Sequence, residues 1–257
     1  MMRFFLIGTC RIHRPFGCDH VKKNPVHFST TYDALNLLGK YSFLGYFYNI
    51  KEIKQLIDIL VNNYSSEVTS DIIDTVINPK FLDPIDLNRQ FETTREIFQL
   101  ADVVVMEIST SKNNRTIVNN HAIHFYEPGI PEEELEIISD QEYGEIFEYL
   151  IRTLTALNKK VLFVSHFNHN NTKSRQFIID MCEKYLDKEL FFNPTETVIN
   201  NLPNSLVDSA HYSKRCEFII MNEIHLKIKD FFWEVREKNM ENQIIKIFLM
   251  YIYIYNQ

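Results

Sequence analysis

The chain has 257 residues, a hydrophobic fraction of 45% and a formal net charge of −7. This length and apolar content are enough to bury one large core. The acidic balance argues against broad nucleic-acid binding, which needs a basic surface. Four cysteines, none of them in a Cys-x-x-Cys pair, favour free thiols in a reducing compartment. We therefore expect a cytoplasmic protein with no nucleic-acid partner.

Buried strands alternate with amphipathic helices along the chain. Apolar runs predict strands at 3–8, 102–108 and 160–165. Helical spacing and capping residues predict helices at 29–38, 50–62, 86–100, 141–158, 172–186 and 213–237. Weaker signals indicate a surface hairpin or an excursion at 116–126 and a short edge strand that begins at 191–192. The alternation predicts an α/β fold with a three-layer, doubly wound parallel sheet, in a single domain over 1–237.

The last segment, 238–257, is an apolar extension of this domain. Its apolar run, 244–255, is far below the roughly 20 residues that a spanning helix needs. We expect a docking strand, a docking helix or a homo-oligomer contact there instead of a membrane anchor. The apolar run 4–7 is too short for the hydrophobic region of a signal peptide.

The turn after the first strand carries a candidate nucleophile. Gly8 ends the apolar run, and Thr9, Cys10 and Arg11 follow it. Open α/β sheets bind their ligands at the carboxyl ends of strands, where backbone N–H groups can lower the pKa of a thiol. Cys10 is therefore the candidate nucleophile, and Thr9 and Arg11 are candidate substrate contacts. The alternative is an ordinary strand-to-helix turn with a buried cysteine.

A candidate base lies near the end of the chain. Asp208 and His211 form an Asp-x-x-His motif just ahead of the last predicted helix. A general base needs a carboxylate to fix its tautomer and to stabilise the imidazolium. The alternative is a helix-entry turn in which Asp208 or Ser209 is a cap and His211 has no chemical role.

The order of these motifs resembles the SGNH (GDSL-type) superfamily of hydrolases and acyltransferases. Gly8-Thr9-Cys10 corresponds to its Gly-Asp-Ser block, and Asp208 and His211 correspond to its terminal carboxylate and base. The cysteine also resembles the Gly-Asn-Cys motif of polysaccharide-biosynthesis acetyltransferase-like proteins. The resemblance covers about residues 3–235. It implies an SGNH or flavodoxin-like fold and an acetyl-coenzyme A-dependent O- or N-acetyltransferase acting on a sugar or glycan precursor.

The chain departs from that superfamily after the strand that ends near Ile108. The Gly-x-Asn-Asp block expected there is replaced by Ser-Thr-Ser-Lys-Asn over residues 109–113. A donor for the oxyanion hole must then come from the Cys10 backbone and from Ser109, Thr110 or Asn113. The glycine of the superfamily's second block is either Gly39 or Gly45, and the motif does not choose between them.

Further candidates follow the strands. Glu107 lies near the end of a buried strand, where its carboxylate needs polar partners. It either lines a catalytic cleft or forms an ion pair with Lys112 or Arg11. His166 follows the third strand and either contacts substrate or is solvated. His13, Arg14 and Arg11 make a basic loop that either binds phosphates of coenzyme A or of a nucleotide sugar, or is solvated surface. His166 and His169 lack the ligand spacing of a metal site, so no metal is expected.

Two other functions stay open. The first is an esterase or deacetylase that acts on carbohydrate or lipid esters through the same residues. The second, of a different class, is a catalytically inactive α/β module that binds a glycan or a protein. In that module Arg11 and Glu107 would form a structural ion pair that fills the cleft.

Overall fold

The computed structural model describes residues 3–16, 46–61, 87–114, 117–118, 121–122 and 135–229. The chain divides into two compact units, Met1–Ile220 and Met221–Gln257. Residues 214–220 of the first unit and 221–229 of the second are helical. The predicted helix 29–38 and the boundary between the predicted domain and its extension, 237/238, lie outside the described residues. No helix among the described residues is long and apolar enough to cross a membrane.

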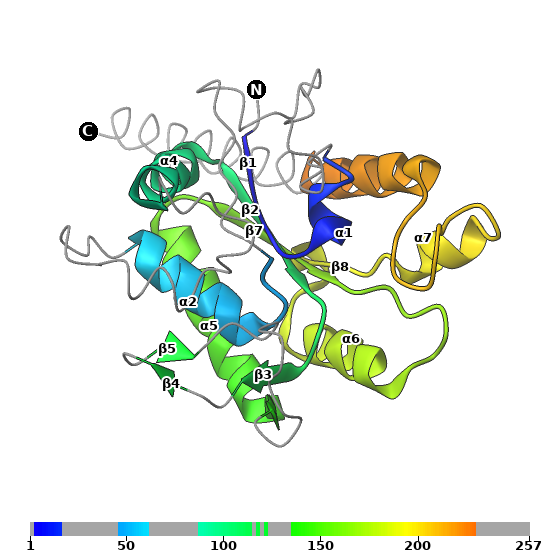
Figure 1. Cartoon of the computed structure of the whole chain (residues 1–257), viewed down its shortest axis with the longest axis horizontal. Coiled ribbons are helices and arrows are strands. Elements are labelled where there is room, and N and C mark those ends of the chain that lie inside the picture. Colours follow the sequence, from blue (N-terminus) through cyan, green and yellow to red (C-terminus); the bar gives the residue numbers. More distant parts are fainter. Residues whose placement is uncertain are drawn as a thin grey trace, which may run out of the picture. The chain divides into compact units, whose positions relative to one another are not determined.

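The first unit is built on a four-stranded parallel sheet with the order β1–β2–β7–β8 (Figure 1). Its strands are β1 (Phe4–Ile7), β2 (Val103–Ile108), β7 (Lys160–Ser165) and β8 (Phe191–Phe192). The three long apolar runs are the strands that the sequence predicts, because strands buried on both faces are apolar throughout. The predicted edge strand at 191–192 is confirmed as well, and it pairs with β7.

Helices connect the strands, which confirms the α/β class. They are α1 (Cys10–His13), α2 (Ile50–Val61), α4 (Leu87–Leu100), α5 (Asp140–Ala156), α6 (Lys173–Tyr185), α7 (Thr195–Asn200) and a 3-10 turn, η4 (Lys188–Leu190). The predicted helices 50–62, 86–100, 141–158 and 172–186 are confirmed to within two residues at each end. The short helices α1, α7 and η4 were not predicted, because single turns carry too little periodicity to be recognised.

Two small antiparallel pairs lie outside the main sheet. Strand β4 (Ile117–Val118) pairs with β5 (His121–Ala122), in agreement with the predicted hairpin. Strand β3 (Lys112–Asn114) pairs with β6 (Leu135–Ile137), a pairing that the sequence did not reveal. It brings together segments on either side of residues 115–134, and such non-local pairing has no signature in local periodicity.

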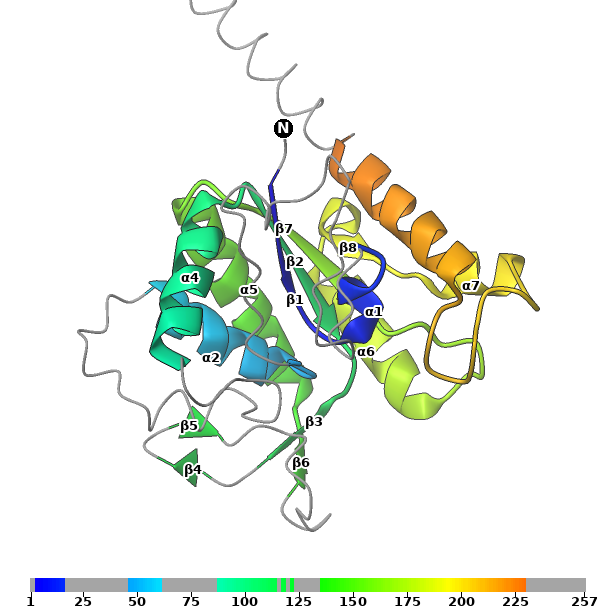
Figure 2. The same cartoon turned by 45° about the horizontal axis from the view of Figure 1, so that its top comes forward.

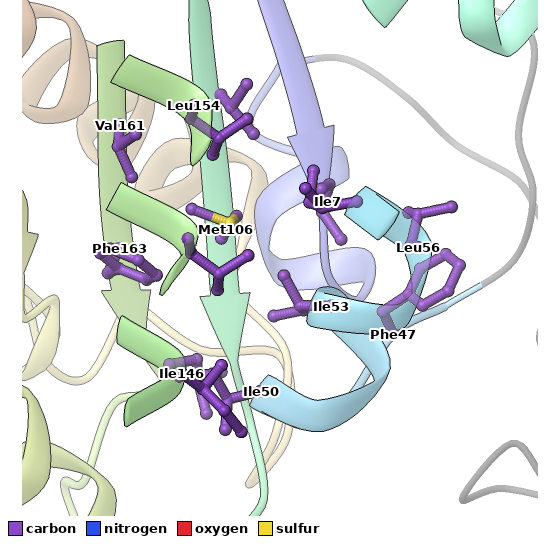
Figure 3. Packing of buried hydrophobic residues seen from close by; sticks show 14 of the residues in the cluster. Ile7, Phe47, Ile50, Ile53, Leu56, Met106, Ile146, Leu154, Val161 and Phe163 are labelled. Carbon is purple, nitrogen blue, oxygen red and sulfur yellow. The ribbon is translucent and has the colours of Figure 1, made fainter. Parts of the chain in front are cut away.

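The principal core lies on one face of the sheet. Alternate side chains of β1, β2 and β7, such as Ile7, Met106 and Phe163, pack against α2 and α5 (Figure 3). Residues of α4 and α6 belong to the same cluster. In Figure 2, α2, α4 and α5 lie on one side of the sheet and α1 lies on the other. Because side chains alternate along a strand, residues of the opposite parity face α1. Glu107 has this parity, and so does His166, one residue past β7.

Candidate functional site

The turn after β1 depends on Gly8. Its φ of +148° is one that L side chains rarely adopt. A Cβ at this position would lie 2.6 Å from Glu107 Cβ and 2.9 Å from Ile12 Cγ2. The glycine therefore lets β1 bend sharply against β2, so that α1 begins at Cys10. Thr9 caps this helix, because its hydroxyl accepts a hydrogen bond from the Arg11 amide.

Glu107 holds that turn in place. Its Oε2 accepts hydrogen bonds from the Thr9 amide at 2.8 Å and the Thr9 hydroxyl at 2.6 Å. Its Oε1 lies 2.7 Å from Arg11 Nε, and the Glu107 side chain is only 1% exposed. Of the partners left open by the sequence, the carboxylate therefore pairs with Arg11. These bonds make Thr9, Arg11 and Glu107 part of the scaffold of the turn, and their contact with a substrate stays a prediction.

Cys10 has a free thiol of intermediate exposure at the start of α1. Burial raises the pKa of this thiol, and Glu107 adds to the effect, although Arg11 and Arg14 oppose it. The expectation that the turn lowers this pKa is therefore wrong in sign, because burial, with the Glu107 carboxylate adding to it, outweighs the nearby cations. At neutral pH Cys10 is protonated, and it needs a base to become a nucleophile.

Asp208 and His211, the candidate base and its carboxylate, contact each other in the loop before residue 214. His211 Nδ1 lies 2.8 and 2.9 Å from the two carboxylate oxygens of Asp208. The Ala210 amide donates to Asp208 at 2.7 Å, and this bond and the His211 contact lower the pKa of the carboxyl. Because an ionised carboxylate only accepts, Nδ1 carries a hydrogen and Nε2 is left to take a proton. The pair is partly exposed, with side-chain exposures of 38% for His211 and 54% for Asp208.

The loop and the turn meet at the same edge of the sheet. Arg11 Nη1 donates to the Ala210 carbonyl at 3.5 Å, so the neighbour of Cys10 contacts the neighbour of His211. Tyr212 is buried against the ring of Phe167, 5.0 Å away between centroids. Burial raises the pKa of the Tyr212 phenol well above its usual value, and the charge of Glu107 adds to this, although Arg11 opposes it. The structure thus links the Cys10 turn to the Asp208–His211 loop through Arg11, and the direct approach of His211 to Cys10 stays a prediction.

His166 continues this edge after β7. Its amide donates to the Ile108 carbonyl at 3.0 Å, and its Nδ1 lies 2.8 Å from the Phe167 carbonyl. Burial lowers the pKa of the imidazole to about 2, and the cations of Arg11 and Arg175 contribute. The ring is therefore neutral at pH 7, with its Nδ1 hydrogen given to Phe167. His166 can offer a substrate a neutral acceptor, but it carries no positive charge.

Residues 2–125 match the model of a family described as the TviD N-terminal domain. The matched region contains Gly8, Cys10 and Glu107, and it stops before His166 and His211. No curated protein and no solved structure matches the chain. The family match therefore bears on the half of the site that comes from β1 and β2.

The expected side-chain donors for an oxyanion are mostly engaged elsewhere. Asn113 is buried in β3 and donates to the Asn114 carbonyl at 3.0 Å and to Glu136 at 3.2 Å. Ser109 donates its hydroxyl to the Tyr48 carbonyl at 3.1 Å. The Thr110 hydroxyl, in contrast, accepts from the Lys112 amide, which leaves its own hydrogen to donate. Asn113 and Ser109 are therefore not available as donors, and Thr110 is the alternative whose hydroxyl hydrogen is left to donate.

The remaining predicted residues have mixed outcomes. The Arg14 amide donates to the Cys10 carbonyl, and its charge acts on the thiol, so it stays beside the turn. Gly39 and Gly45 lie outside the described residues. In the part of the chain that the structure describes, no group of three or more His, Cys, Asp or Glu side chains is arranged to hold a metal ion.

Two residues of this edge were missed by sequence reasoning. Tyr212 directly follows His211, and its burial depends on Phe167. Arg175 lies in the first turn of α6 and acts electrostatically on Arg11 and Tyr212. A possible signal was position, because α6 begins just after the β7 loop that leads into the site.

Proposed function

We propose that this chain is an acyltransferase that moves an acetyl group from acetyl-coenzyme A to a hydroxyl or amine of a sugar or glycan precursor. The observation that carries the proposal is the Asp208–His211 pair, which Arg11 ties to the Cys10 turn through the Ala210 carbonyl. A free thiol, an oriented imidazole and a carboxylate at one sheet edge are the parts that acyl transfer needs. The identities of donor and acceptor rest on the resemblance to the SGNH superfamily.

In the first step, His211 Nε2 removes the Cys10 proton as Sγ attacks the thioester carbonyl. The tetrahedral intermediate collapses when its bond to the coenzyme A sulfur breaks, and His211 gives the proton to that sulfur. In the second step, His211 deprotonates the acceptor as it attacks the acetyl-Cys10 thioester. The Cys10 sulfur then leaves and takes the proton back. Asp208 stabilises the imidazolium in both steps.

The raised pKa of Cys10 agrees with this order of events. A thiol that is protonated at neutral pH is activated by the base at the moment of attack, as a serine is, and does not wait as a thiolate. We propose that the Cys10 backbone amide and the Thr110 hydroxyl stabilise the developing oxyanion.

The proposal extends to the context of the enzyme. We propose the doubly wound, three-layer arrangement of SGNH and flavodoxin-like proteins for the sheet. We also propose a cytoplasmic location, which would keep Cys10, Cys182 and Cys216 as the free thiols that the structure contains. Self-association through residues 244–255, which lie outside the described part, is proposed as the role of the apolar extension.

The rival of a different class is an inactive binding module. The observation in its favour is the buried Arg11–Glu107 pair, because such a pair can serve structure alone. The two functions differ in one measurable respect: only the enzyme forms a covalent acetyl intermediate or a product.

The test is intact-mass measurement of the full chain after incubation with acetyl-coenzyme A, with and without a panel of sugars. We expect a gain of one acetyl group on the parent and its transfer when the correct acceptor is present. Cys10→Ala should abolish both, and Cys10→Ser should retain slow turnover because a hydroxyl can use the same base. Full activity of Cys10→Ala would exclude the covalent route. Release of acetate without transfer to a sugar would identify an esterase. The absence of any reaction would favour the binding module.

A further inference from the structure

In the described part of the chain, Arg175 makes its contacts with uncharged groups. Its Nη1 donates to the Phe167 carbonyl at 3.2 Å, and its guanidinium lies 5.5 Å from the centre of the Phe167 ring. Neither partner carries a charge. Among the described residues no carboxylate lies within ion-pair distance of Arg175. A partly buried guanidinium with four remaining N–H donors is costly to keep unless a ligand or water accepts from it.

This guanidinium belongs to the same edge as the proposed active site. Burial lowers the pKa of Arg175, and repulsion from Arg11 lowers it further. The Phe167 ring, over which Arg175 lies, also packs against Tyr212, the neighbour of His211. Arg175 is therefore connected through one aromatic ring to the loop that carries His211.

Some of the charged groups at this edge are paired with one another. Arg11 is neutralised by Glu107, whose two oxygens are both occupied. His166 is neutral, and burial and Arg175 also lower the pKa of His169. The imidazoles of His166 and His169 can both donate or accept a hydrogen bond. Neither changes the net charge of this edge at pH 7. The guanidinium of Arg175 is a charge that remains for an incoming anion, in addition to that of Arg14 beside the Cys10 turn.

We propose that Arg175 binds a phosphate group of the substrate, with His169 beside it as a neutral hydrogen-bonding partner. This inference rests on the proposed function, which supplies phosphates in coenzyme A and in a nucleotide-activated sugar. A guanidinium fork matches two phosphate oxygens at once. The sequence left two roles open for the basic loop of His13, Arg14 and Arg11, which were phosphate binding and solvated surface. The structure favours Arg175 over Arg11 for phosphate binding, because Arg11 is held by Glu107, whereas Arg175 has four guanidinium N–H groups left to donate.

The test is calorimetric titration of the full chain with coenzyme A and, separately, with uridine diphosphate. Arg175→Gln removes the charge while its amide can still donate to the Phe167 carbonyl, so the fold should be kept. We expect the affinity for one of these probes to fall about 10- to 100-fold, as for the loss of charged hydrogen bonds. Arg175→Lys should recover part of the affinity, because it keeps the charge but loses the fork. The matched control is Arg152→Gln, on the exposed face of α5, which should bind like the parent.

The probe that responds identifies the source of the phosphate. A loss for coenzyme A assigns Arg175 to the acyl donor, and a loss for uridine diphosphate assigns it to a sugar nucleotide. Equal affinities of the parent and Arg175→Gln for both probes would overturn the proposal, as would an equal loss in Arg152→Gln. Binding is measured without turnover, so the two proposals can fail separately. Binding that depends on Arg175 without any acetylation would contradict only the proposed enzyme activity. Acetylation together with unaltered binding in Arg175→Gln would contradict only the proposed phosphate site.

Discussion

Strand β2 has an arginine–carboxylate pair at each end, and the two pairs differ in their surroundings. At the amino end, Arg3 binds Asp102 through its amide, Nε and Nη2, and both side chains are about one-third exposed. At the carboxyl end, Arg11 binds Glu107, and the pair is almost completely buried. Exposed pairs contribute little to stability, whereas buried ones are costly to break.

The difference between the two pairs shows at which end of β2 an ion pair is buried and connects several segments. The amino-end pair joins β1 to β2 in water, and its loss would leave two groups that solvent can hydrate. The carboxyl-end pair joins the Cys10 turn to β2 and, through Ala210, to the His211 loop. Burial there means that the turn, the carboxylate and the loop depend on one another, as expected where a site must be held rigidly.

The largest effect is expected at the base. His211→Ala should reduce turnover about 10²- to 10⁴-fold, because the thiol and the acceptor lose their general base. Its partly exposed ring has no core role, so the fold should persist. Steady-state acetylation, with circular dichroism as the check on folding, measures this. Asp102→Ala is the amino-end control and should keep parental turnover; equal turnover of His211→Ala and the parent would remove His211 from the mechanism.

The two ion pairs can be compared directly by stability. Glu107→Ala should cost about 3–5 kcal/mol of unfolding free energy, because it leaves Arg11 buried without its partner. Asp102→Ala should cost only about 0–1 kcal/mol, since its partner stays hydrated. Urea unfolding of both variants gives the comparison. Similar losses in the two variants would show that burial does not distinguish the two ends of β2.

A smaller, pH-dependent effect is expected from His166. Its folded pKa, about 2, is below the value of 6.5 for an unperturbed histidine. The unfolded chain therefore binds the proton more readily, and the stability is complete above pH 6.5 and declines as the pH falls below it. The loss should reach about 2 kcal/mol at pH 5. His166→Asn keeps a donor for the Phe167 carbonyl and should show a flatter profile over this range; parallel profiles would contradict the burial of a neutral ring.

The mildest test concerns the reactivity of the thiols. Cys10 is partly exposed and Cys182 is fully buried in α6, so iodoacetamide should alkylate Cys10 first. Because burial raises the pKa of Cys10, the alkylation rate should still be rising above pH 9. Peptide mass spectrometry over a pH series measures both. A plateau below pH 8 would mean that the thiol is already ionised at neutral pH.

Local sequence determined the parts of this protein whose partners are close in the chain. The strands at β1, β2 and β7 follow from apolar runs, the long helices follow from their periodicity, and the Asp208–His211 pair spans only three residues. A turn was predictable at Gly8, because an apolar run ends there. In each of these cases, short-range geometry is sufficient to bring the groups together.

Tertiary structure decided everything that depends on the register between strands. Glu107 had two possible partners in the sequence, and the pairing of β1 with β2 placed Thr9 and Arg11 beside it. The direction of the Cys10 pKa shift followed from burial and from that carboxylate, neither of which a turn motif reveals. Arg175 and Tyr212 became part of the site because the β7 loop and the loop before residue 214 meet at the same sheet edge. Long-range packing sets these distances, and with them the charges that each group experiences.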